Sequence, residues 1–299
     1  MEFRLLGPFD VVAAGSSVDL GPPKQRVLLA GLAVDAGRRV SPVTLIDRIW
    51  DGTPPREATN VLHTYMSRIR RVLRTSAGAD APATVERNAA GYRLVVDAEN
   101  VDLRRFSALA DRARALRPGD PQRAALLGDA VRLWRGEALA GLPGAWAARV
   151  RQRLREQRLN VVTTWAEAEL DAARYPDVLE VLEELVAENP LVESLIALLM
   201  RTLTLAGRDA EALEAFARIR QRIAAELGTE PGPDLRALHA MLLRGRASGA
   251  ETIQPRPDRH PAPVSRAPLS SAPVSPAPFN AAPIRPAQLP PEVHGFTGR

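Results

Sequence analysis

The apolar positions of residues 1–96 follow a strand-like spacing first and a helical spacing later. The chain opens with the short strand-like runs "FRLL", "FDVVA" and "SVDL", which glycine-containing turns separate. Three segments of helical spacing follow, and they begin near Pro23, Ser41 and Ala58. The next segment, "TVERNAAGYRLVV", is typical of a hairpin with "NAAG" as its turn. Strands, three helices and a hairpin in this order predict a winged helix-turn-helix over residues 1–96.

Two of these helices begin with recognisable start signals. Pro23 stands at the first turn of the first helix, and Gly37 follows its last apolar residue. Ser41 and Pro42 begin the second helix, with the pattern of a serine N-cap followed by proline at the first helical position. Gly52 and two prolines come after the second helix and predict its end.

The third helix, residues 58–74, separates its side chains into two faces. At about 100° per residue, its apolar side chains gather in one arc of roughly 140°. The apolar residues of that arc are Val61, Leu62, Tyr65, Met66, Ile69, Val72 and Leu73. The opposite arc carries Asn60, Thr64, Ser67, Arg71 and Arg74, with His63, Arg68 and Arg70 beside it. The segment contains four arginines and no acidic residue.

The chemistry of the polar arc fits duplex DNA. Arginine can donate two hydrogen bonds to guanine, and asparagine can pair with adenine in the same way. On an isolated helix, a polar and positive face would most simply be a solvated one. This helix, however, follows a helix-breaking turn and precedes a hairpin with Arg87 and Asn88 near its tip. In helix-turn-helix proteins that helix enters the major groove, so we predict DNA contact.

The predicted roles within this helix differ by position. The residues best placed for base edges or for phosphates of the groove wall are Asn60, Thr64, Ser67 and Arg71. Phosphate contacts are predicted for Arg68, Arg70 and Arg74. His63 is as compatible with a neutral surface residue as with a DNA contact.

Four cations outside this helix are further candidates. Arg87 and Arg93 lie on the hairpin and could reach the minor groove or the DNA backbone. Arg93 is equally compatible with a strand residue that points to water. Lys24 and Arg26, near the first turn of the first helix, could donate to a phosphate, and solvated side chains are the alternative.

Residues 101–247 are almost wholly amphipathic helix. "RYPDVLEVLEEL" (174–185) aligns with "RDAEALEAFARI" (208–219) at an offset of 34 residues. That period is typical of tetratricopeptide-like helix pairs, which stack into concave protein-binding surfaces. We therefore predict an all-α tetratricopeptide-like domain over 101–247, in which most repeat residues serve core packing alone.

Three other features of the C-terminal part carry predictions. The tryptophans at 134, 146 and 165 are predicted to be core or inter-helix anchors, and the acidic run 180–188 a solvated face. Residues 248–299 hold 12 of the 26 prolines, with alanine and serine between them. This composition predicts a disordered linker. The expected fold class is thus mainly α, with an α+β winged helix at the start and a disordered Pro-rich tail.

The positive charge of the chain is concentrated at its N-terminus. Residues 1–95 hold 13 basic and 9 acidic residues, whereas residues 101–247 hold 22 and 21. The absence of cysteine excludes disulfides and thiolate metal sites. The start "MEFR" does not resemble a signal peptide, and apolar runs such as "VLLAGLAV" are too short to span a bilayer. A cytoplasmic, nucleoid-associated protein without a membrane partner is expected.

Sequence motifs for catalysis are missing. Neither a GxxxxGK[ST] phosphate loop nor an HExxH or GxSxG motif occurs, and the four histidines are scattered. We therefore predict that the protein is not an enzyme, has no catalytic or metal-binding residues and needs no cofactor.

Several segments together resemble the Streptomyces antibiotic regulatory protein family. "FRLLGPFDV", "GPPKQRVLLAGLAVDAGRRVS", "LIDRIWDGTPPREATNVLHTYMSRIRRVL" and "GYRLVVD" are similar to its response-regulator-type winged helix. "VDLRRFSALADRARAL", "AVRLWRGEALAGL" and "AELGTEPGPDLRALHAMLL" are similar to its bacterial transcriptional activation domain. The resemblance covers residues 1 to about 245 and is specific in order and spacing.

The resemblance implies an activator of a secondary-metabolite gene cluster. Such proteins bind direct repeats in double-stranded DNA near the promoter −35 element as paired protomers, and they recruit RNA polymerase holoenzyme. The resemblance thus implies that "TNVLHTYMSRIRRVL" reads DNA and that a homodimer forms on it. A repressor with the same winged helix, or a helical-repeat module that contacts protein instead of DNA, are the alternatives from the residues alone.

The C-terminal end departs from the small members of this family. "AQLPPEVHGFTGR" is similar to the segment that leads into a nucleotide-binding NTPase domain in large members, and no such domain follows. The sequence is either a piece of a larger regulator, which we favour, or a short relative that keeps a remnant.

Overall fold

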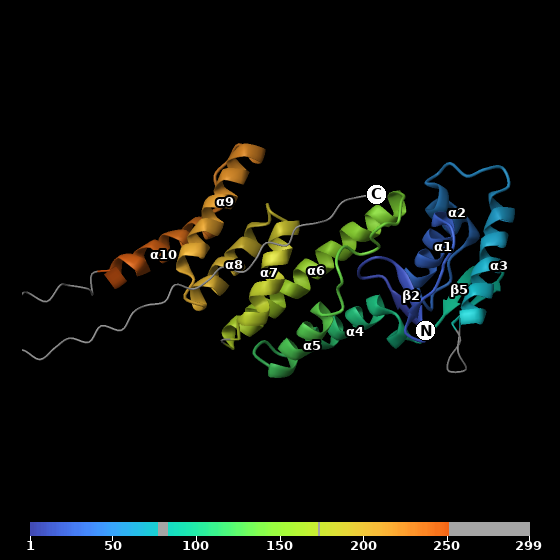
Figure 1. The fold of residues 1–299 in the computed structure, drawn as a ribbon, viewed down its shortest axis with the longest axis horizontal. Helices are drawn as coiled ribbons and strands as arrows, with labels where there is room; N and C mark the ends of the chain where they lie inside the picture. The colour runs from blue at the N-terminus through green and yellow to red at the C-terminus, as the bar shows by residue number, and fades with distance from the viewer. Residues whose placement is uncertain (77–82, 173, 251–299) are drawn as a thin grey trace, which may run out of the picture. The chain divides into compact units, whose positions relative to one another are not determined.

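The N-terminal part of the chain folds as strands, helices and a hairpin, in the order that its sequence pattern predicts (Figure 1). The computed structural model describes residues 1–76, 83–172 and 174–250. The strands of the first sheet, in the order β1-β2-β3, are β1 (Glu2–Arg4), β2 (Asp10–Ala13) and β3 (Ser16–Ser17). The elements that follow are α1 (Pro23–Val34), α2 (Pro42–Trp50), α3 (Ala58–Ser76), β4 (Thr84–Asn88) and β5 (Gly91–Val95).

The serine cap of α2 is confirmed. The Ser41 hydroxyl accepts a hydrogen bond from the backbone N–H of Thr44 at 3.1 Å, and Pro42 occupies the first helical position. At the other end, Asp51 adopts a left-handed conformation with φ 49° and ends the helix. α2 therefore starts and stops where its local chemistry dictates.

The hairpin is joined to the turn before α2. β4 and β5 pair antiparallel, and Asn88 stands opposite Gly91 across the tip. Tyr92 exchanges two backbone hydrogen bonds with Val40, at 2.8 and 2.9 Å. A Cβ at Gly91, where φ is +133°, would lie 2.2 Å from the Val40 carbonyl oxygen, so glycine is required for this close approach.

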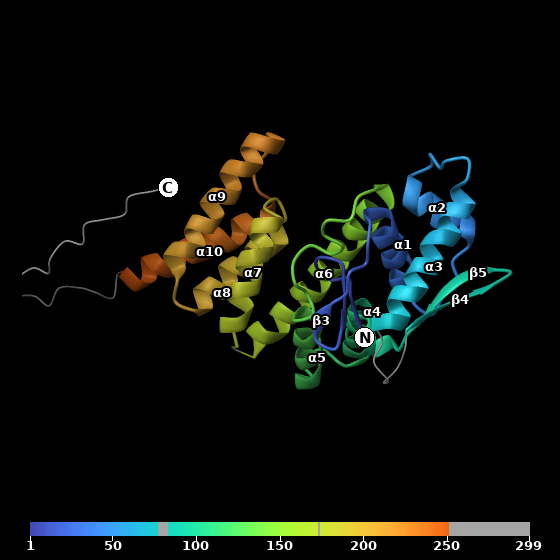
Figure 2. The same cartoon turned by 45° about the vertical axis from the view of Figure 1, so that its right-hand side comes forward.

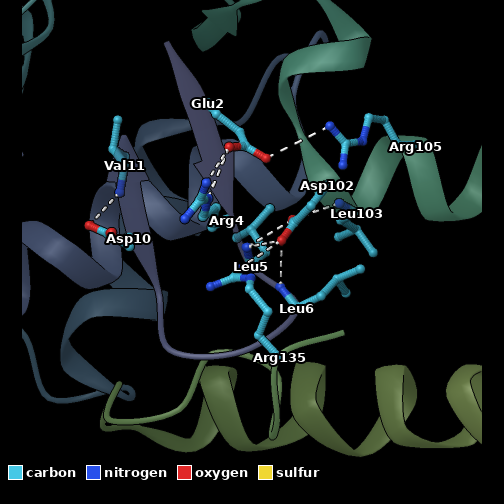
Figure 3. Close-up of polar contacts among 10 residues, drawn as sticks. All are labelled: Glu2, Arg4, Leu5, Leu6, Asp10, Val11, Asp102, Leu103, Arg105 and Arg135. Carbon is cyan, nitrogen blue, oxygen red and sulfur yellow. Dashed lines mark hydrogen bonds and ion pairs between the residues drawn. The ribbon is translucent and has the colours of Figure 1, made fainter. Parts of the chain in front are cut away.

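The first strand is shorter than predicted. The run "FRLL" suggested a strand that includes Leu5 and Leu6, yet β1 ends at Arg4. The N–H groups of Leu5 and Leu6 bind the carboxylate of Asp102 instead of a neighbouring strand (Figure 3). A contact between residues 97 positions apart therefore decides where this strand stops.

After a short 3-10 turn, η1 (Ala98–Asn100), the described part of the chain is helical. The helices are α4 (Asp102–Ala115), α5 (Pro121–Val131), α6 (Ala145–Asp171), α7 (Pro176–Glu188), α8 (Glu193–Leu205), α9 (Asp209–Leu227) and α10 (Pro233–Ala250). The predicted fold class, a winged helix followed by an all-helical domain, is confirmed. The two aligned segments of the 34-residue repeat fall on α7 and α9, each followed by a second helix. From residue 251 on, the predicted linker lies outside the described residues.

The core runs without interruption from the winged helix into the helical region. Buried side chains from Phe3 to Leu242 form one cluster, to which Trp146 and Trp165 belong. These two tryptophans are 7% and 4% exposed, as predicted for core anchors, and Trp134 is partly buried against the same core. Among the described residues, no helix combines the length and the low polarity that crossing a membrane requires.

The buried carboxylate of Asp102 joins the two parts of this core (Figure 3). Its side chain is 3% exposed and accepts N–H groups from Leu5, Leu6 and Leu103 at 2.7–3.0 Å. Arg135, from the loop after α5, donates to it at 3.1 Å. Burial raises the pKa of Asp102 above its ordinary value, and the hydrogen bonds from Leu6, Leu5 and Arg135 oppose that rise.

A second junction joins α2 to the start of α6. The Asp51 carboxylate accepts the backbone N–H of Ala145 at 2.9 Å and so caps the N-terminus of α6. The guanidinium of Arg48 forms an ion pair with Asp35 at 2.8 Å and lies 5.3 Å from the ring centroid of Trp146. The helix that precedes α3 is therefore tied directly to the helical region.

The acidic side chains of the run 180–188 are exposed, as predicted, and have a structural contact that the prediction did not include. Its glutamates are exposed, as expected for a solvated face. Glu184 and Glu188 also accept hydrogen bonds from Arg158, whose side chain is 8% exposed, at 3.1 and 2.9 Å. A buried arginine on a neighbouring helix needs such partners, and helical periodicity alone could not reveal it.

Candidate nucleic-acid interface

α3 buries its apolar face and leaves its polar face exposed. Leu62, Met66, Ile69 and Leu73 are at most 1% exposed. The residues of the opposite face are all exposed: Asn60, Thr64, Ser67, Arg68, Arg71 and Arg74. The division into two faces that the sequence predicts is thus present in the structure.

Packing on three sides sets the orientation of α3. The helix contacts α1, α2 and β4, and both views show it beside the hairpin (Figure 1 and Figure 2). Because its buried residues recur every three or four positions, the apolar stripe faces this packing and the polar face turns away from it. The arrangement presents the polar face as a continuous exposed surface along the helix.

Three arginines of this face form no ion pair with any residue that the structure describes. Among the described residues, Arg68, Arg71 and Arg74 have no carboxylate within 4.0 Å, in contrast to Arg48 and Arg93. Thr64 donates its hydroxyl to the carbonyl of Asn60 one turn back, at 3.0 Å. Uncompensated guanidinium groups on an exposed helix can attract phosphate oxygens and can also donate in pairs to a guanine edge.

Arg70 has a structural contact that its predicted role did not include. Its Nε donates to the backbone carbonyl of Val85 in β4 at 2.8 Å. Its guanidinium carbon lies 6.0 Å from the ring centroid of Tyr92 in β5. Arg70 therefore ties α3 to the hairpin, and it is half-buried where its neighbours on the polar face are exposed.

The two arginines of the hairpin differ in their surroundings. Arg93 is half-buried and forms an ion pair with Glu86 across the hairpin at 2.7 Å, so part of its charge is compensated within the hairpin. Arg87 is exposed, and its guanidinium carbon lies 5.6 Å from the ring centroid of Tyr92. Of the two, Arg87 keeps its charge available at the tip.

The remaining candidates lie at the edges of the surface or on other elements. His63 is half-buried on α3. Lys24 is exposed at the start of α1, with its Nζ 5.3 Å from the ring centroid of Trp50. Arg26 donates to the backbone carbonyl of Phe9 at 3.2 Å and so fastens the segment before β2. The structure does not place Lys24 and Arg26 on the polar face of α3.

The exposed cation Arg56 was not among the candidate residues that the sequence suggested. Arg56 lies in the turn between α2 and α3, two positions before the first residue of α3. Positive charge next to the N-terminus of a recognition helix is the signal that could have pointed to it. No group of three or more His, Cys, Asp or Glu side chains suited to a metal ion occurs in the parts of the chain that the structure describes.

Two family sequence patterns match the chain. The bacterial transcriptional activator domain matches residues 101–243, and the C-terminal domain of transcriptional regulatory proteins matches residues 15–94. The second match contains α1, α2, α3 and the hairpin.

Curated relatives are regulators from two groups of bacteria. The transcriptional regulator RedD of Streptomyces coelicolor is 37% identical over 246 residues, which are 81% of this chain and 70% of that protein. The regulatory protein AfsR of the same organism is 37% identical over 277 residues, 89% of this chain. The transcriptional regulatory protein MoaR1 of Mycobacterium tuberculosis is 36% identical, and the match covers 79% of its length. The chain spans only 27% of the length of AfsR.

A solved structure has a similar fold. Mycobacterium tuberculosis EmbR, in complex with a low-affinity phosphopeptide, superposes with a TM-score of 0.68 at 33% sequence identity. The match covers 84% of this chain and 70% of that one.

Proposed function

This chain belongs to the Streptomyces antibiotic regulatory protein family of transcriptional activators, and on that basis we propose that it activates a secondary-metabolite gene cluster by sequence-specific DNA binding. The observation that carries the proposal is the exposed, acid-free polar face of α3. In this proposal residues 1–96 bind DNA and residues 101–247 form the activation domain.

The polar face of α3 enters the major groove in this proposal. Asn60, Thr64, Ser67 and Arg71 point to base edges or to phosphates of the groove wall. Arg68 and Arg74 neutralise phosphates. Both are exposed and form no ion pair among the described residues, so they can do so at little desolvation cost. His63 stands at the border of this surface and contributes a contact only where the groove wall approaches it.

The hairpin supplies the second set of contacts. Arg87 at its tip reaches the minor groove or the backbone beside the major groove that α3 occupies. Arg70 positions the hairpin relative to α3, because it donates to Val85 and packs on Tyr92. Its remaining N–H groups are then held next to the phosphates. Lys24 and Arg26 take part only through phosphates that pass the first turn of α1.

Our proposal for the assembly of the protein on DNA is based on its family. We propose that two protomers bind direct repeats near the promoter −35 element, side by side, and that they recruit RNA polymerase holoenzyme through the helical domain. Direct repeats place the protomers in the same orientation about one DNA turn apart. The firm connection of α2 to α6 through Asp51 supports this, because it would hold the helical domain in a defined direction relative to the DNA.

A selection from a random duplex library tests sequence-specific binding. An enriched sequence with two repeats at one-turn spacing is expected. The affinity for this sequence is measured by fluorescence anisotropy. Its logarithm should fall linearly with the logarithm of the salt concentration, with a slope near −0.9 per phosphate contact. No enrichment together with a salt-independent affinity would reject DNA binding and favour a helical-repeat module that contacts protein.

In vitro transcription separates an activator from a repressor. A promoter that carries the enriched repeats near its −35 element is transcribed with purified RNA polymerase holoenzyme. More transcript on addition of the protein supports the proposal, and less transcript identifies a repressor with the same winged helix.

A further inference from the structure

The segment between α1 and α2 lies along the outer edge of the hairpin. The backbone N–H of Gly37 donates to the carbonyl of Leu94 at 3.0 Å, and Val40 forms an antiparallel bridge with Tyr92 in β5. Residues 36–40 are thus held beside β5 by backbone hydrogen bonds, independently of any ligand. We call residues 36–40, β4 and β5 together the wing.

This edge segment reaches the hairpin close to its tip. Gly91 is the first residue of β5 after the tip. A Cβ at Gly91 would lie 2.2 Å from the carbonyl oxygen of Val40 and 3.0 Å from the Cα atom of Ser41. Arg39 directly precedes Val40, so its backbone is fixed next to the end of the hairpin that the proposed function brings to DNA.

Arg39 points to the outer face of the wing. Val40 is 5% exposed and Tyr92 is 1% exposed, so both side chains face the core. Because side chains alternate along extended backbone, Arg39 turns to the opposite face, and it is exposed. Arg93, which follows Tyr92, lies on the same outer face with its cross-strand partner Glu86.

The wing has an excess of positive charge. Residues 36–40 and 84–95 contain four arginines and one acidic residue. These are Arg38, Arg39, Arg87, Arg93 and Glu86. The acidic residue is engaged with Arg93 at 2.7 Å, whereas the other three arginines are exposed and form no ion pair with any described residue.

The acids that flank the wing do not remove this excess. Asp35, just before the edge segment, is paired with Arg48 at 2.8 Å. Asp97 and Glu99 follow β5 at the end away from the tip, and the Asp97 carboxylate accepts the backbone N–H of Glu99 at 3.0 Å. The outer edge near the tip therefore offers guanidinium groups to an outside anion.

We propose that Arg39 and Arg38 bind backbone phosphates of DNA beyond the stretch that α3 and the hairpin tip cover. The inference rests on the proposed function, because it takes α3 to lie in the major groove with Arg87 at the tip of the hairpin. An exposed arginine on the outer face beside the tip then meets the next phosphates along the duplex. Such contacts read no bases; they add affinity and fix the position of the protein on the duplex.

Salt titrations on the 299-residue chain test these contacts. The probe is a duplex with one copy of the enriched repeat between long flanks, so that a single protomer is measured by fluorescence anisotropy. In the double variant Arg38→Gln, Arg39→Gln, the slope of log affinity against log salt concentration should become shallower by about 0.9 for each lost contact. Affinity at roughly 0.1 M salt should fall by about five- to tenfold per contact. An unchanged slope and affinity would overturn the proposal.

A matched control separates a local contact from an effect of net charge. Arg201 on α8 and Arg236 on α10 are exposed, form no ion pair among the described residues and belong to the last helices of the helical region. The double variant Arg201→Gln, Arg236→Gln removes the same charge and should keep the wild-type slope. Equal changes in the two double variants would reject the contacts.

Hydroxyl-radical footprinting locates the contacts on the DNA. Arg87→Gln identifies the flank that faces the hairpin, because protection should weaken there. The double variant at 38 and 39 should lose protection only next to that position, on the side away from the enriched repeat. Loss spread over the whole site, or confined to the opposite flank, would contradict the proposal.

Failure of this inference is distinct from failure of the proposed function. Wild-type protein that binds the enriched repeat with a steep salt dependence, together with a double variant that behaves in the same way, rejects only the outer-edge contacts. Wild-type protein without salt-dependent binding rejects both. Both exchanged side chains are exposed and unpaired in the described structure, so the midpoint of thermal unfolding should match that of the wild type.

Discussion

The carboxylate of Asp102 accepts the backbone N–H of Leu5 at 2.8 Å, across 97 positions of sequence. The same carboxylate accepts the N–H of Leu6 at 3.0 Å, so the first residue of α4 satisfies backbone donors that β1 leaves unpaired. The start of the helical region therefore completes the hydrogen bonding of the winged helix. This buried carboxylate couples the two parts, in addition to the junction between α2 and α6.

Asp102→Ala should destabilise the whole described fold. The substitution leaves the buried N–H groups of Leu5 and Leu6, and the guanidinium of Arg135, without their acceptor. Removing one partner of a buried charged network costs about 3–5 kcal/mol, which urea unfolding would measure. Asp111→Ala on the same helix is the control, because its ion pair with Arg114 is exposed and should contribute less than about 1 kcal/mol. Equal losses in the two variants would contradict the role of Asp102.

Arg135→Gln should raise the pKa of Asp102 further. Burial already raises this pKa above 3.8, and Arg135 is one of the groups that oppose the rise. A folded-state pKa above the unfolded one means that stability falls as pH rises through the folded pKa. Without Arg135 the ionised carboxylate is less well compensated, so the destabilisation should be larger at pH 7 than below pH 3.8. Carboxyl ¹³C chemical shifts report the pKa, and urea unfolding at both pH values reports the stability; a pH-independent difference would refute the argument.

Gly91→Ala should displace the hairpin. Its Cβ would lie 2.2 Å from the Val40 carbonyl oxygen, at a φ of +133° that disfavours side chains. We expect a loss of about 3 kcal/mol or more in the free energy of unfolding. Gly15→Ala is matched in having a positive φ, +79°, but no atom lies within 4 Å of the added carbon. Gly15→Ala should therefore lower the free energy of unfolding only by the backbone strain, about 1 kcal/mol.

Arg71→Ala and Arg74→Ala should weaken DNA binding in different ways. If Arg71 donates to a base, Arg71→Ala should reduce the free energy of binding to the enriched sequence by about 1–3 kcal/mol and relax specificity at one base-pair position. If Arg74 contacts a phosphate, Arg74→Ala should weaken binding about equally on all sequences. The slope of log affinity against log salt concentration should then become shallower by the contribution of about one phosphate contact. Fluorescence anisotropy on the enriched and a scrambled duplex distinguishes the two. Wild-type affinity in both variants would move the DNA-binding surface away from α3.

Arg70→Ala should lower stability where Arg68→Ala does not. Arg70 is the donor for the Val85 carbonyl, and its loss should cost about 1 kcal/mol of folding free energy. Arg68 is exposed and makes no ion pair among the described residues, so its removal should change stability by less than about 0.5 kcal/mol. Thermal unfolding of both variants measures the difference, and equal midpoints would show that the contact to the hairpin contributes nothing.

The local elements of the winged helix could be predicted because their signals are short-range. Ser41 caps α2, and the two-residue tip of the hairpin forms at "NAAG". The apolar residues of α3 recur at intervals of three and four, which places them on one face whatever the helix packs against. The exposed polar face, and with it the candidate DNA-binding residues of α3, followed from this periodicity.

Contacts between distant segments could not be predicted in this way. Residue spacing does not reveal that Asp102 ends β1, that Arg70 binds the hairpin, or that Glu184 and Glu188 hold a buried arginine. Each depends on which elements pack side by side, and many packings are compatible with the same local pattern.

The sequence by itself determined the helix and hairpin signals, the two faces of α3 and the order of a winged helix before a helical region, because spacing and turn chemistry act within a few residues. Only the tertiary structure decided which polar groups are buried together. Asp102 on α4, and Trp134 beside Arg158, acquire their surroundings from segments far away in the chain. Burying such polar groups costs free energy unless they are hydrogen-bonded or paired, and which groups are buried depends on how the whole chain packs.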